Sequence, residues 1–463
     1  MARPISRREL LVNSTLATAA VTIVPRSVLG GTGFVAPSDR VNIAVIGTGG
    51  QGITNIKELF KEPDARVTAI ADPNEESDYS RFYYGGTAGR APALRLIEEH
   101  FQQHGEPDAK CTPYLDYREM LDQEKSIDAV LVATPDHVHA VATMAAIERG
   151  KHVYCEKPLT HTIYEARRIR EAAHEAGVAT QMGNQGHSGE GIRKTCEWIW
   201  DGAIGPIREV HAWTGANGWA KGGRPKDTPP VPKTLDWDLW LGPAPYRPYH
   251  PAYAPYNWRG WWAFGTGSIG DMACHNIDPA FWALKLGYPT TVEAIDAEIN
   301  PETVPADSTV RYEFPARGDL PPVTLTWYDG ERRPPKPEGM DPNKPFDGNG
   351  IIFIGEKGSI ICGGWGGPPT LLPESLARSY TPPPKSLPRS NGHHRDWLDA
   401  CKGGPQPSAN FDYSGPMVEV VLLGNVAQRS GKKLEWDGAN MTVTNDAEAN
   451  RFVQTTYRAG WRL

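Results

Sequence analysis

The chain has 463 residues, more than a single hydrophobic core usually accommodates, so we expect at least two domains. Apolar residues make up 39% of the chain and charged residues 22%, which is typical of a soluble globular protein. The formal net charge of −7 is small and spread along the chain, which argues against a nucleic-acid-binding surface.

The first residues, MARPISRRELLVNSTLATAAVTIVPRSVLGG, resemble a twin-arginine export signal. Arg7 and Arg8 precede a weakly apolar run, residues 10–24, which polar residues interrupt. This run is too short and too polar to span a bilayer stably. We therefore assign residues 1–37 to a signal peptide and linker, and we expect a periplasmic or otherwise exported protein. The alternative is a disordered basic tail.

A glycine-rich turn follows the first expected strand, residues 41–46. Its glycines satisfy the pattern G-x-G-x-x-G, which allows a tight turn, close approach of a pyrophosphate, and close packing of helix on strand. A helix expected to begin near Gly50 would present unpaired N–H groups to the phosphates. The residues of this turn that we expect at a dinucleotide are Gly47, Thr48, Gly49, Gly50, Gln51 and Gly52.

A second expected strand, residues 66–72, ends at Asp72, which follows Gly52 by twenty residues. An acidic side chain at this spacing accepts hydrogen bonds from the ribose hydroxyls of NAD. A carboxylate there repels a 2′-phosphate, and the next residues, Pro73 and Asn74, supply no arginine to bind one. The sequence therefore favours NAD over NADP as the cofactor.

Strands and helices continue to alternate up to residue 183. Strands are expected at 128–135, 151–155 and 178–182, and helices at 139–150 and 163–177. This order predicts a doubly wound parallel sheet, so we assign residues 38–183 to an NAD-binding Rossmann domain. Ligands of such sheets lie beyond the carboxyl ends of the strands. The further cofactor-binding candidates at or near those ends are Thr134, Pro135, His137, His139, Glu156 and Lys157.

The composition shifts from about residue 184 onwards. Nine of the fifteen tryptophans lie between residues 198 and 262, in a stretch rich in proline and glycine. Later segments, at 207–215, 291–299, 308–314, 323–330 and 350–364, alternate like antiparallel strands, and two helices are expected at 393–404 and 415–431. Residues 184–463 are therefore predicted to form an α+β domain with a large, mainly antiparallel open sheet.

The segment GTGSIGDMACHNIDPAFWALKLG, residues 265–287, lies within this second domain. A helix over 271–286 places Asp271 and His275 on one face. The acid can orient the imidazole and stabilise its charged form, while the ring titrates near neutral pH, so the pair suits proton transfer. The alternative is a helix cap or an ordinary polar contact. The thirteen histidines and six cysteines show no metal-ligand spacing, and DHVH at 136–139 comes nearest, so we expect no metal.

The glycine fingerprint, the motif CEKPL at 155–159 and the D-x-x-x-H helix resemble the Gfo/Idh/MocA oxidoreductases over nearly all of residues 40–463. The resemblance implies that Lys157 reaches the nicotinamide ribose and the reacting hydroxyl. It also implies that His275 is the acid/base with Asp271 as its partner, and that Arg259, after Trp258, approaches the cofactor. The export signal and the tryptophan-rich stretch are similar to exported members that act on sugars and polyols. Family members commonly associate through the second sheet, so a homo-oligomer is expected.

From these observations we expect hydride transfer between nicotinamide and a carbinol carbon of a sugar, polyol or glycoside. The hydroxyl proton would pass to His275 or to Lys157, whose pKa we expect to be lowered beside the oxidised nicotinamide. The residues expected at the substrate are Asn184, Gln185, His187, Trp258, Asp271 and His275. Two alternatives stay open: a redox-neutral NAD-dependent enzyme that cleaves glycosides by oxidation, elimination and re-reduction, and a non-catalytic protein that binds NAD or sugar.

Overall fold

The computed structural model describes residue 36 and residues 39–216 and 222–463 of the chain. Residues 41–463 pack as one unit. The expected export signal therefore lies almost entirely outside the described residues. Within them, no helix combines the length and the apolar composition that crossing a membrane requires.

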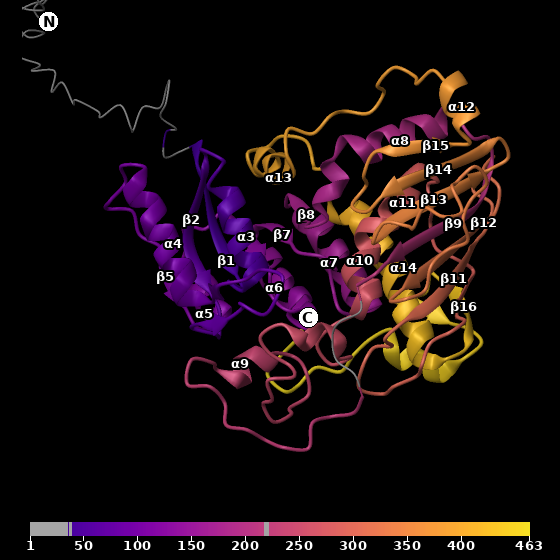
Figure 1. Cartoon of the computed structure of the whole chain (residues 1–463). Coiled ribbons are helices and arrows are strands. Elements are labelled where there is room, and N and C mark those ends of the chain that lie inside the picture. The colour runs from indigo at the N-terminus through magenta and orange to yellow at the C-terminus, as the bar shows by residue number, and fades with distance from the viewer. Residues whose placement is uncertain (1–35, 37–38, 217–221) are drawn as a thin grey trace, which may run out of the picture. The chain divides into compact units, whose positions relative to one another are not determined.

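The first half of the chain forms a six-stranded parallel sheet, which confirms the predicted Rossmann architecture (Figure 1). In the order of the sheet, its strands are β5 (Thr112–Tyr114), β2 (Ala65–Ala71), β1 (Val41–Ile46), β6 (Ala129–Val132), β7 (His152–Cys155) and β8 (Thr180–Met182). The chain runs outwards from β1 to β5 and then returns to continue from β6 to β8. Ligands of such sheets bind where this reversal occurs, beyond the carboxyl ends of β1 and β6.

Helices and one small hairpin connect these strands. They are α3 (Gly50–Leu59), β3 (Ser77–Asp78), β4 (Thr87–Ala88), α4 (Arg90–Gln103), α5 (Tyr117–Gln123), α6 (Asp136–Ile147) and α7 (Ile163–Ala176). Local sequence defines α7 sharply, because Thr162 and Glu165 form a reciprocal capping box at its start. Gly177 ends α7 in the left-handed region, at φ 64°.

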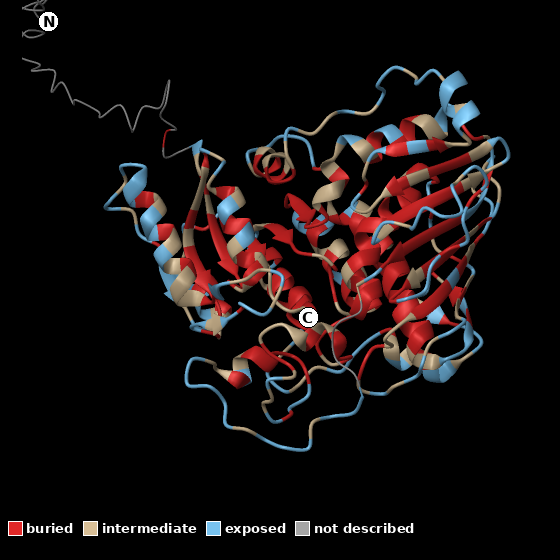
Figure 2. Ribbon diagram, viewed as in Figure 1, coloured by how far each residue is buried: buried red, intermediate tan, exposed pale blue. Residues whose placement is uncertain are grey.

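The second half forms a nine-stranded sheet, as expected for an α+β domain. Its strands, in the order of the sheet, are β15 (Pro369–Leu372), β14 (Gly358–Gly363), β13 (Asn349–Gly355), β9 (Ile207–Thr214), β12 (Val323–Asp329), β11 (Ser308–Phe314), β10 (Thr291–Ala294), β16 (Lys433–Asp437) and β17 (Thr442–Val443). Only β9 and β12 pair in parallel, and every other neighbouring pair is antiparallel. The strands of both sheets are mostly buried (Figure 2).

The helical elements of the second half are η2 (Gln185–Ser188), α8 (Glu190–Trp200), α9 (Trp237–Leu241), η3 (Asn257–Gly260), α10 (Gly267–Asn276), α11 (Asp278–Ala283), α12 (Glu374–Ser379), α13 (His393–Cys401), α14 (Phe411–Ser430) and η4 (Ala447–Phe452). The long helix α14 packs against both α7 and α10. Helix α13 returns to the first sheet, where Trp397 and Leu398 join the core formed by β1, α3 and α4.

The expectation of one continuous helix over 271–286 is wrong. The structure divides this stretch into α10 and α11, which meet at Ile277. Pro279 explains the break, because its ring has no N–H and would clash with the carbonyl group of His275 in a continuous helix. Asp271 and His275 still share α10.

Candidate active site

The glycine-rich turn between β1 and α3 leaves no room for side chains. A Cβ on Gly47, whose φ is +86°, would lie 2.6 Å from the carbonyl oxygen of Ala133, and one on Gly52 would lie 2.1 Å from that of Gly47. No side chain caps the start of α3. The N–H of Gly50 contacts the hydroxyl of Tyr79, and the N–H groups that follow it in the first turn of α3 can face an anion, as the sequence pattern predicts.

Asp72 lies beside this turn, directly after β2. Its carboxylate accepts hydrogen bonds from the backbone N–H of Thr48 at 2.7 Å, the hydroxyl of Thr48 at 3.2 Å, and the backbone N–H of Asn74 at 2.8 Å. Burial raises the pKa of Asp72, against the effect of these donors. The residues next to Asp72 in the sequence supply no arginine, but the structure places Arg90 nearby, where its guanidinium donates to the carbonyl oxygen of Asp72.

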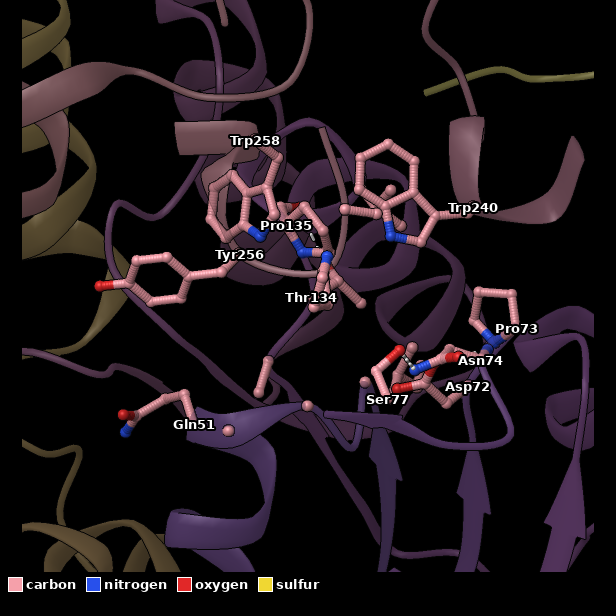
Figure 3. A pocket seen from close by; sticks show the side chains of 18 of the residues that line it. Gln51, Asp72, Pro73, Asn74, Ser77, Thr134, Pro135, Trp240, Tyr256 and Trp258 are labelled. Atoms are coloured by element: carbon pink, nitrogen blue, oxygen red, sulfur yellow. Dashed lines mark hydrogen bonds between the residues drawn. The ribbon is translucent and has the colours of Figure 1, made fainter. Parts of the chain in front are cut away.

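A pocket extends from this turn along the carboxyl ends of the strands. Figure 3 shows Trp240, Tyr256 and Trp258 on one side of it, and Gln51 and Asp72 on the opposite side. The expected site residues that line it are Gly47, Gly49, Gly50, Gln51, Asp72, Thr134, Pro135, His139, Glu156, Lys157, Trp258, Arg259 and Asp271. The expected residues outside its lining are Thr48, Gly52, His137, Asn184, Gln185, His187 and His275.

Lys157 and Asp271 form a partly buried ion pair at this pocket. The ammonium group of Lys157 donates to a carboxylate oxygen of Asp271 at 2.7 Å and to its backbone carbonyl at 3.0 Å. Arg259 lies on the other side, with its Nε 3.8 Å from the same carboxylate oxygen. Strand β7 and helix α10 thus bring together residues that are 114 positions apart in the chain.

The side chains of this cluster determine one another's charge in the protein without its cofactor. Burial acts to lower the pKa of Lys157, but Asp271 outweighs burial and raises that pKa above its usual value. Burial acts to raise the pKa of Asp271, but Lys157 and Arg259 bring it below its usual value. In the protein alone Lys157 is therefore a stable ammonium, whereas the sequence led us to expect a lowered pKa beside the oxidised nicotinamide.

His275 lies one helical turn beyond Asp271 on α10. Asp271 is bonded to Lys157, and within the described residues no hydrogen bond joins its carboxylate to the ring of His275. The Nδ1 atom of that ring is buried without a partner. Burial, followed by the charge of Lys157, lowers the pKa of His275 to about 3, so the ring is neutral at physiological pH.

A second polar cluster gathers around Asp278, at the start of α11. Its carboxylate accepts from Nδ1 of His187 at 3.0 Å, from the amide of Asn184 at 3.0 Å and from the hydroxyl of Tyr413 at 2.5 Å. Nε2 of His187 and Oδ1 of Asn184 are buried without partners, as is Nδ1 of His275. Three buried polar atoms thus lack partners, although burying such groups normally requires them.

Glu156 is a buried carboxylate that binds the glycine-rich turn to the end of the sheet. One of its oxygens accepts from the side-chain amides of Gln51 at 3.0 Å, Asn55 at 2.9 Å and Gln185 at 3.1 Å. Burial raises the pKa of Glu156. The structure therefore places Gln185 against Glu156, behind the lining of the pocket.

His137 and His139 each lie between two backbone carbonyl groups. The ring nitrogens of His137 contact the carbonyl oxygens of Phe264 and Trp240, both at 3.2 Å. Those of His139 contact Pro158 at 2.7 Å and Thr134 at 2.9 Å. Burial lowers the pKa of His137 to about 3 and that of His139 to about 4. Both rings hold loops together, and the described residues contain no group of three ligands that could bind a metal.

Sequence reasoning missed the aromatic residues around the glycine-rich turn. The ring of Tyr84 lies 2.2 Å from where a Cβ on Gly50 would be, and its hydroxyl donates to the side chain of Gln51 at 3.2 Å. Phe82 stacks on Tyr256 at 4.6 Å. The cluster YSRFYYGG at 79–86, directly after the second strand, is the sequence signal that could have indicated them.

The tryptophan-rich stretch covers one side of the pocket. We call residues 232–264 the aromatic segment, in which Trp237, Trp240, Tyr253, Trp258 and Trp261 form a small core of their own. It is bound to the loop after β2, where the N–H of Glu75 donates to Thr234 at 2.7 Å and the N–H of Asp236 donates to Pro73 at 2.9 Å. Trp240 and Trp258 therefore belong both to this local core and to the wall of the pocket.

Two family models match the chain. The NAD-binding Rossmann fold of the Gfo/Idh/MocA oxidoreductase family matches residues 41–184, and the C-terminal alpha/beta domain of that family matches residues 206–320. Together they span more than half of the chain.

Individual proteins of known sequence or structure are similar as well. An inositol 2-dehydrogenase from Rubrobacter xylanophilus is 31% identical over 30% of this chain and 33% of its own length. A 2,7-anhydro-N-acetylneuraminate hydratase from Escherichia coli is 26% identical over 39% of this chain and 40% of its own length. The matches thus span two fifths or less of these relatives. The WlbA dehydrogenase from Bordetella pertussis, in complex with NADH and UDP-GlcNAcA, has a similar fold, with a TM-score of 0.55 and 18% identity over 86% of this chain and 99% of that one.

Proposed function

The chain belongs to the Gfo/Idh/MocA family of NAD-binding oxidoreductases, and on this basis we propose that it transfers a hydride between nicotinamide and a carbinol carbon of a sugar, polyol or glycoside. The observation that carries the proposal is the ion pair of Lys157 and Asp271, which lines the same pocket as the glycine-rich turn. A dinucleotide with its pyrophosphate on α3 and its ribose at Asp72 would extend along this pocket towards Lys157.

The proposed cofactor is NAD rather than NADP. The carboxylate of Asp72 lines the pocket and would repel a 2′-phosphate. Arg90, the arginine nearest to it, is not part of that lining and is engaged with a backbone carbonyl. When bound, the nicotinamide supplies the hydride chemistry, and the residues of this chain supply binding, orientation and proton transfer.

We assign the proton transfer to Lys157 and His275 in different roles. The ammonium group of Lys157, held by Asp271, donates a hydrogen bond to the reacting hydroxyl and stabilises negative charge that develops on its oxygen. His275 is neutral and has a free ring nitrogen, so it can accept the proton. Its pKa is low partly because Lys157 is positively charged. An alkoxide forming beside Lys157 would offset that charge and raise the pKa of His275 when the ring must take up the proton.

The unpaired polar atoms support a polyhydroxylated substrate. Oδ1 of Asn184, Nε2 of His187 and Nδ1 of His275 are all buried and without partners. Hydroxyl groups both donate and accept, so neighbouring hydroxyls of one sugar could satisfy acceptors and donors alike. Asp278 fixes Asn184 and His187 from behind and therefore acts as a positioning residue.

A redox-neutral reaction is the second candidate, and the aromatic segment favours it. This segment is hydrogen-bonded to the loop after β2 and walls the pocket, so a bound dinucleotide would be slow to leave. A cofactor that stays bound has to be restored within each catalytic cycle. One relative is named as a hydratase, and adding water causes no net oxidation.

The first test is to denature the purified protein and measure released nicotinamide nucleotide per chain. Near-stoichiometric NAD(H) would support a resident cofactor and direct the search to glycosides and to pairs of sugars. An empty protein that binds added NAD weakly would favour an ordinary dehydrogenase. Tight NAD binding without turnover of any substrate in a broad sugar panel would overturn both enzymatic proposals in favour of a binding protein.

The second test separates chemistry from cofactor binding. We expect His275→Gln and Lys157→Met to retain the nucleotide and to lose turnover by a factor of about 10²–10⁴, the usual contribution of a placed proton-transfer group. His174→Gln is the matched control, because that side chain is 77% exposed on α7. Turnover at the control's rate in either variant would remove the role assigned to that residue.

We also propose that residues 1–37 direct export and that the protein self-associates through the nine-stranded sheet. Sequencing the amino terminus of protein recovered from the periplasm tests the first point, and an intact first residue in a cytoplasmic protein would contradict it. Light scattering during size-exclusion chromatography tests the second, and a monomer at micromolar concentration would contradict it.

A further inference from the structure

A second cavity shares no lining residue with the cofactor pocket. It lies among the starts of α6 and α7, the aromatic segment, the end of α14 and the region of η4. Four arginines line it, namely Arg224, Arg247, Arg429 and Arg451, whereas its acidic lining residues are Glu165 and Glu302. The net charge of this cavity therefore depends on whether those two carboxylates neutralise the arginines.

Both carboxylates are already engaged. Glu302 accepts from Arg224 at 2.9 Å and lies 3.4 Å from Arg247, so one acid serves two guanidinium groups. Glu165 accepts from the backbone N–H groups of the capping box and from the hydroxyl of Tyr457 at 2.6 Å. Neither acid forms an ion pair with Arg429 or Arg451.

Arg429 and Arg451 have mainly aromatic neighbours. The guanidinium of Arg429 lies 4.1 Å from the ring centre of Phe452 and 5.3 Å from that of Trp262. Arg451 lies 4.7 Å from the same Phe452 ring, and its ion pair with Glu448 is long, at 3.9 Å, and largely exposed. Throughout the described residues, Arg429 has neither a hydrogen bond nor an ion pair.

Arg429 is half-buried, and no group of the described residues accepts a hydrogen bond from its guanidinium. A guanidinium carries five N–H donors and no acceptor, and aromatic faces satisfy its charge but not its donors. Burial, together with the charge of Arg451, lowers the pKa of Arg429 to about 10, so the group remains charged at neutral pH. Two neighbouring cations, one without an ion pair and the other with only a long and exposed one, are suited to an anion that presents several oxygens.

We propose that this second cavity binds an oxyanion, that is, the phosphate, sulfate or carboxylate group of a small molecule, between the guanidinium groups of Arg429 and Arg451. The forked donors of arginine match the spacing of two oxygens on such a group. The rings of Trp262 and Phe452 lie against the guanidinium of Arg429, and Phe452 also lies against that of Arg451, which restrains both groups and reduces the entropy lost on binding. The site does not depend on the proposed catalytic function.

The test is calorimetric titration of the full chain with sodium sulfate and with sodium phosphate, against sodium chloride of equal ionic strength. We expect saturable binding of both oxyanions and none of chloride. Arg429→Gln and, separately, Arg451→Gln should each raise the dissociation constant at least tenfold, because each removes a charge-assisted contact. The matched control is Arg378→Gln on α12, an arginine that is 75% exposed and paired only with Glu374.

The same two variants distinguish this cavity from any second place where an anion could bind. Binding that survives both substitutions would place the anion elsewhere, for example on the glycine-rich turn, and would overturn the proposal. Arg451 is 67% exposed, so Arg451→Gln should fold even if Arg429→Gln does not. The proposal would also be contradicted if the protein self-associates with rising concentration and this association prevents sulfate binding. The two arginines would then pair with a carboxylate of a second copy of the chain.

Discussion

At the scale of single residues, the ion pair between Lys157 and Asp271 determines the protonation of both partners. Asp271 keeps Lys157 charged, and Lys157 helps to keep His275 neutral. Each of these effects depends on a charge that lies nearby in space and far away in the chain. A substitution of Asp271 should therefore change the titration of Lys157 rather than only remove a contact.

We expect Asp271→Asn to lower the pKa of Lys157, because burial then acts without the opposing carboxylate. Turnover at pH 7 should fall at least about tenfold. The alkaline limb of the pH–rate profile should move to lower pH, because Lys157 loses its proton earlier. The profile of kcat/KM tests this, with Asp412→Asn, 55% exposed beside Arg170, as the control. An unchanged alkaline limb would contradict the role of the ion pair.

Most of the site residues that the sequence predicted line the pocket, but they are fewer than half of its lining, and their partners were not predicted. Gly47, Asp72 and Lys157 are recognisable because each follows a strand at a fixed spacing. The attachment of His187 and Asn184 to Asp278 is not recognisable, because it links segments more than 90 residues apart. Tyr84 was missed for a similar reason, since nothing local shows that its ring covers Gly50.

At the scale of elements, periodicity predicted every strand of the first sheet except the short edge strand β5, and several strands of the second sheet. It could not order the nine strands of the second sheet, because β9 pairs with strands that lie over a hundred residues later. The segments that cover the pocket have no regular periodicity at all. The aromatic segment and the loop bearing β3 and β4 are fixed by ring packing and backbone hydrogen bonds.

We expect Tyr84→Ala to speed release of NAD at least about tenfold, because the ring covers the glycine-rich turn and bonds to Gln51. Tyr83→Ala is a closely matched control, since its side chain is 89% exposed on the same loop. Stopped-flow displacement of bound NADH, followed by its fluorescence, measures the rate. Equal rates in the two variants would show that this loop does not retain the cofactor.

The close contact between α3 and β1 yields a prediction about stability. Gly52→Ala places a Cβ 2.1 Å from the carbonyl oxygen of Gly47, so the helix must shift. We expect the free energy of unfolding to fall by about 1–3 kcal/mol. Gly287→Ala, where a Cβ would meet nothing within 4 Å, should leave it nearly unchanged. Urea denaturation of both variants measures the difference, and similar midpoints would contradict the predicted steric clash.

At the scale of the whole molecule, buried histidines dominate the response to acid. Burial lowers the pKa of His137 and His275 to about 3 and that of His139, His161 and His394 to about 4. In the unfolded chain these rings titrate near 6.5. The stability that they contribute is therefore complete above about pH 6.5 and is lost as the pH falls towards 4.

Six buried carboxyl groups act in the opposite direction, those of Asp72, Asp136, Glu156, Glu165, Asp329 and Glu419. Burial raises the pKa of Asp136 to about 7 and that of Asp329 to about 6, so their contribution grows as the pH falls. Burial also lowers the pKa of His100, His152, His211 and His393, so nine histidines of the described residues oppose these six carboxyl groups. We therefore expect the melting temperature to fall by roughly 5 °C or more between pH 7 and pH 5. His394→Phe, which keeps a ring against Tyr154, should reduce this difference. A melting temperature that is constant over this range would contradict the dominance of the histidines.

Helix α13 has a consequence for any exchange of parts between this protein and its relatives. Residues 393–401 come late in the chain, yet Trp397 is fully buried in the core of the first sheet, and Arg395 pairs with Asp64 at its edge. In a chimera joined only near residue 184, this helix would pack against the first domain of the other parent. The side chain of Trp397 would then lack the core into which it packs here. An exchange of the nucleotide-binding half must therefore transfer two separate stretches of sequence. These are the nucleotide-binding half itself and α13, which completes the core of that half.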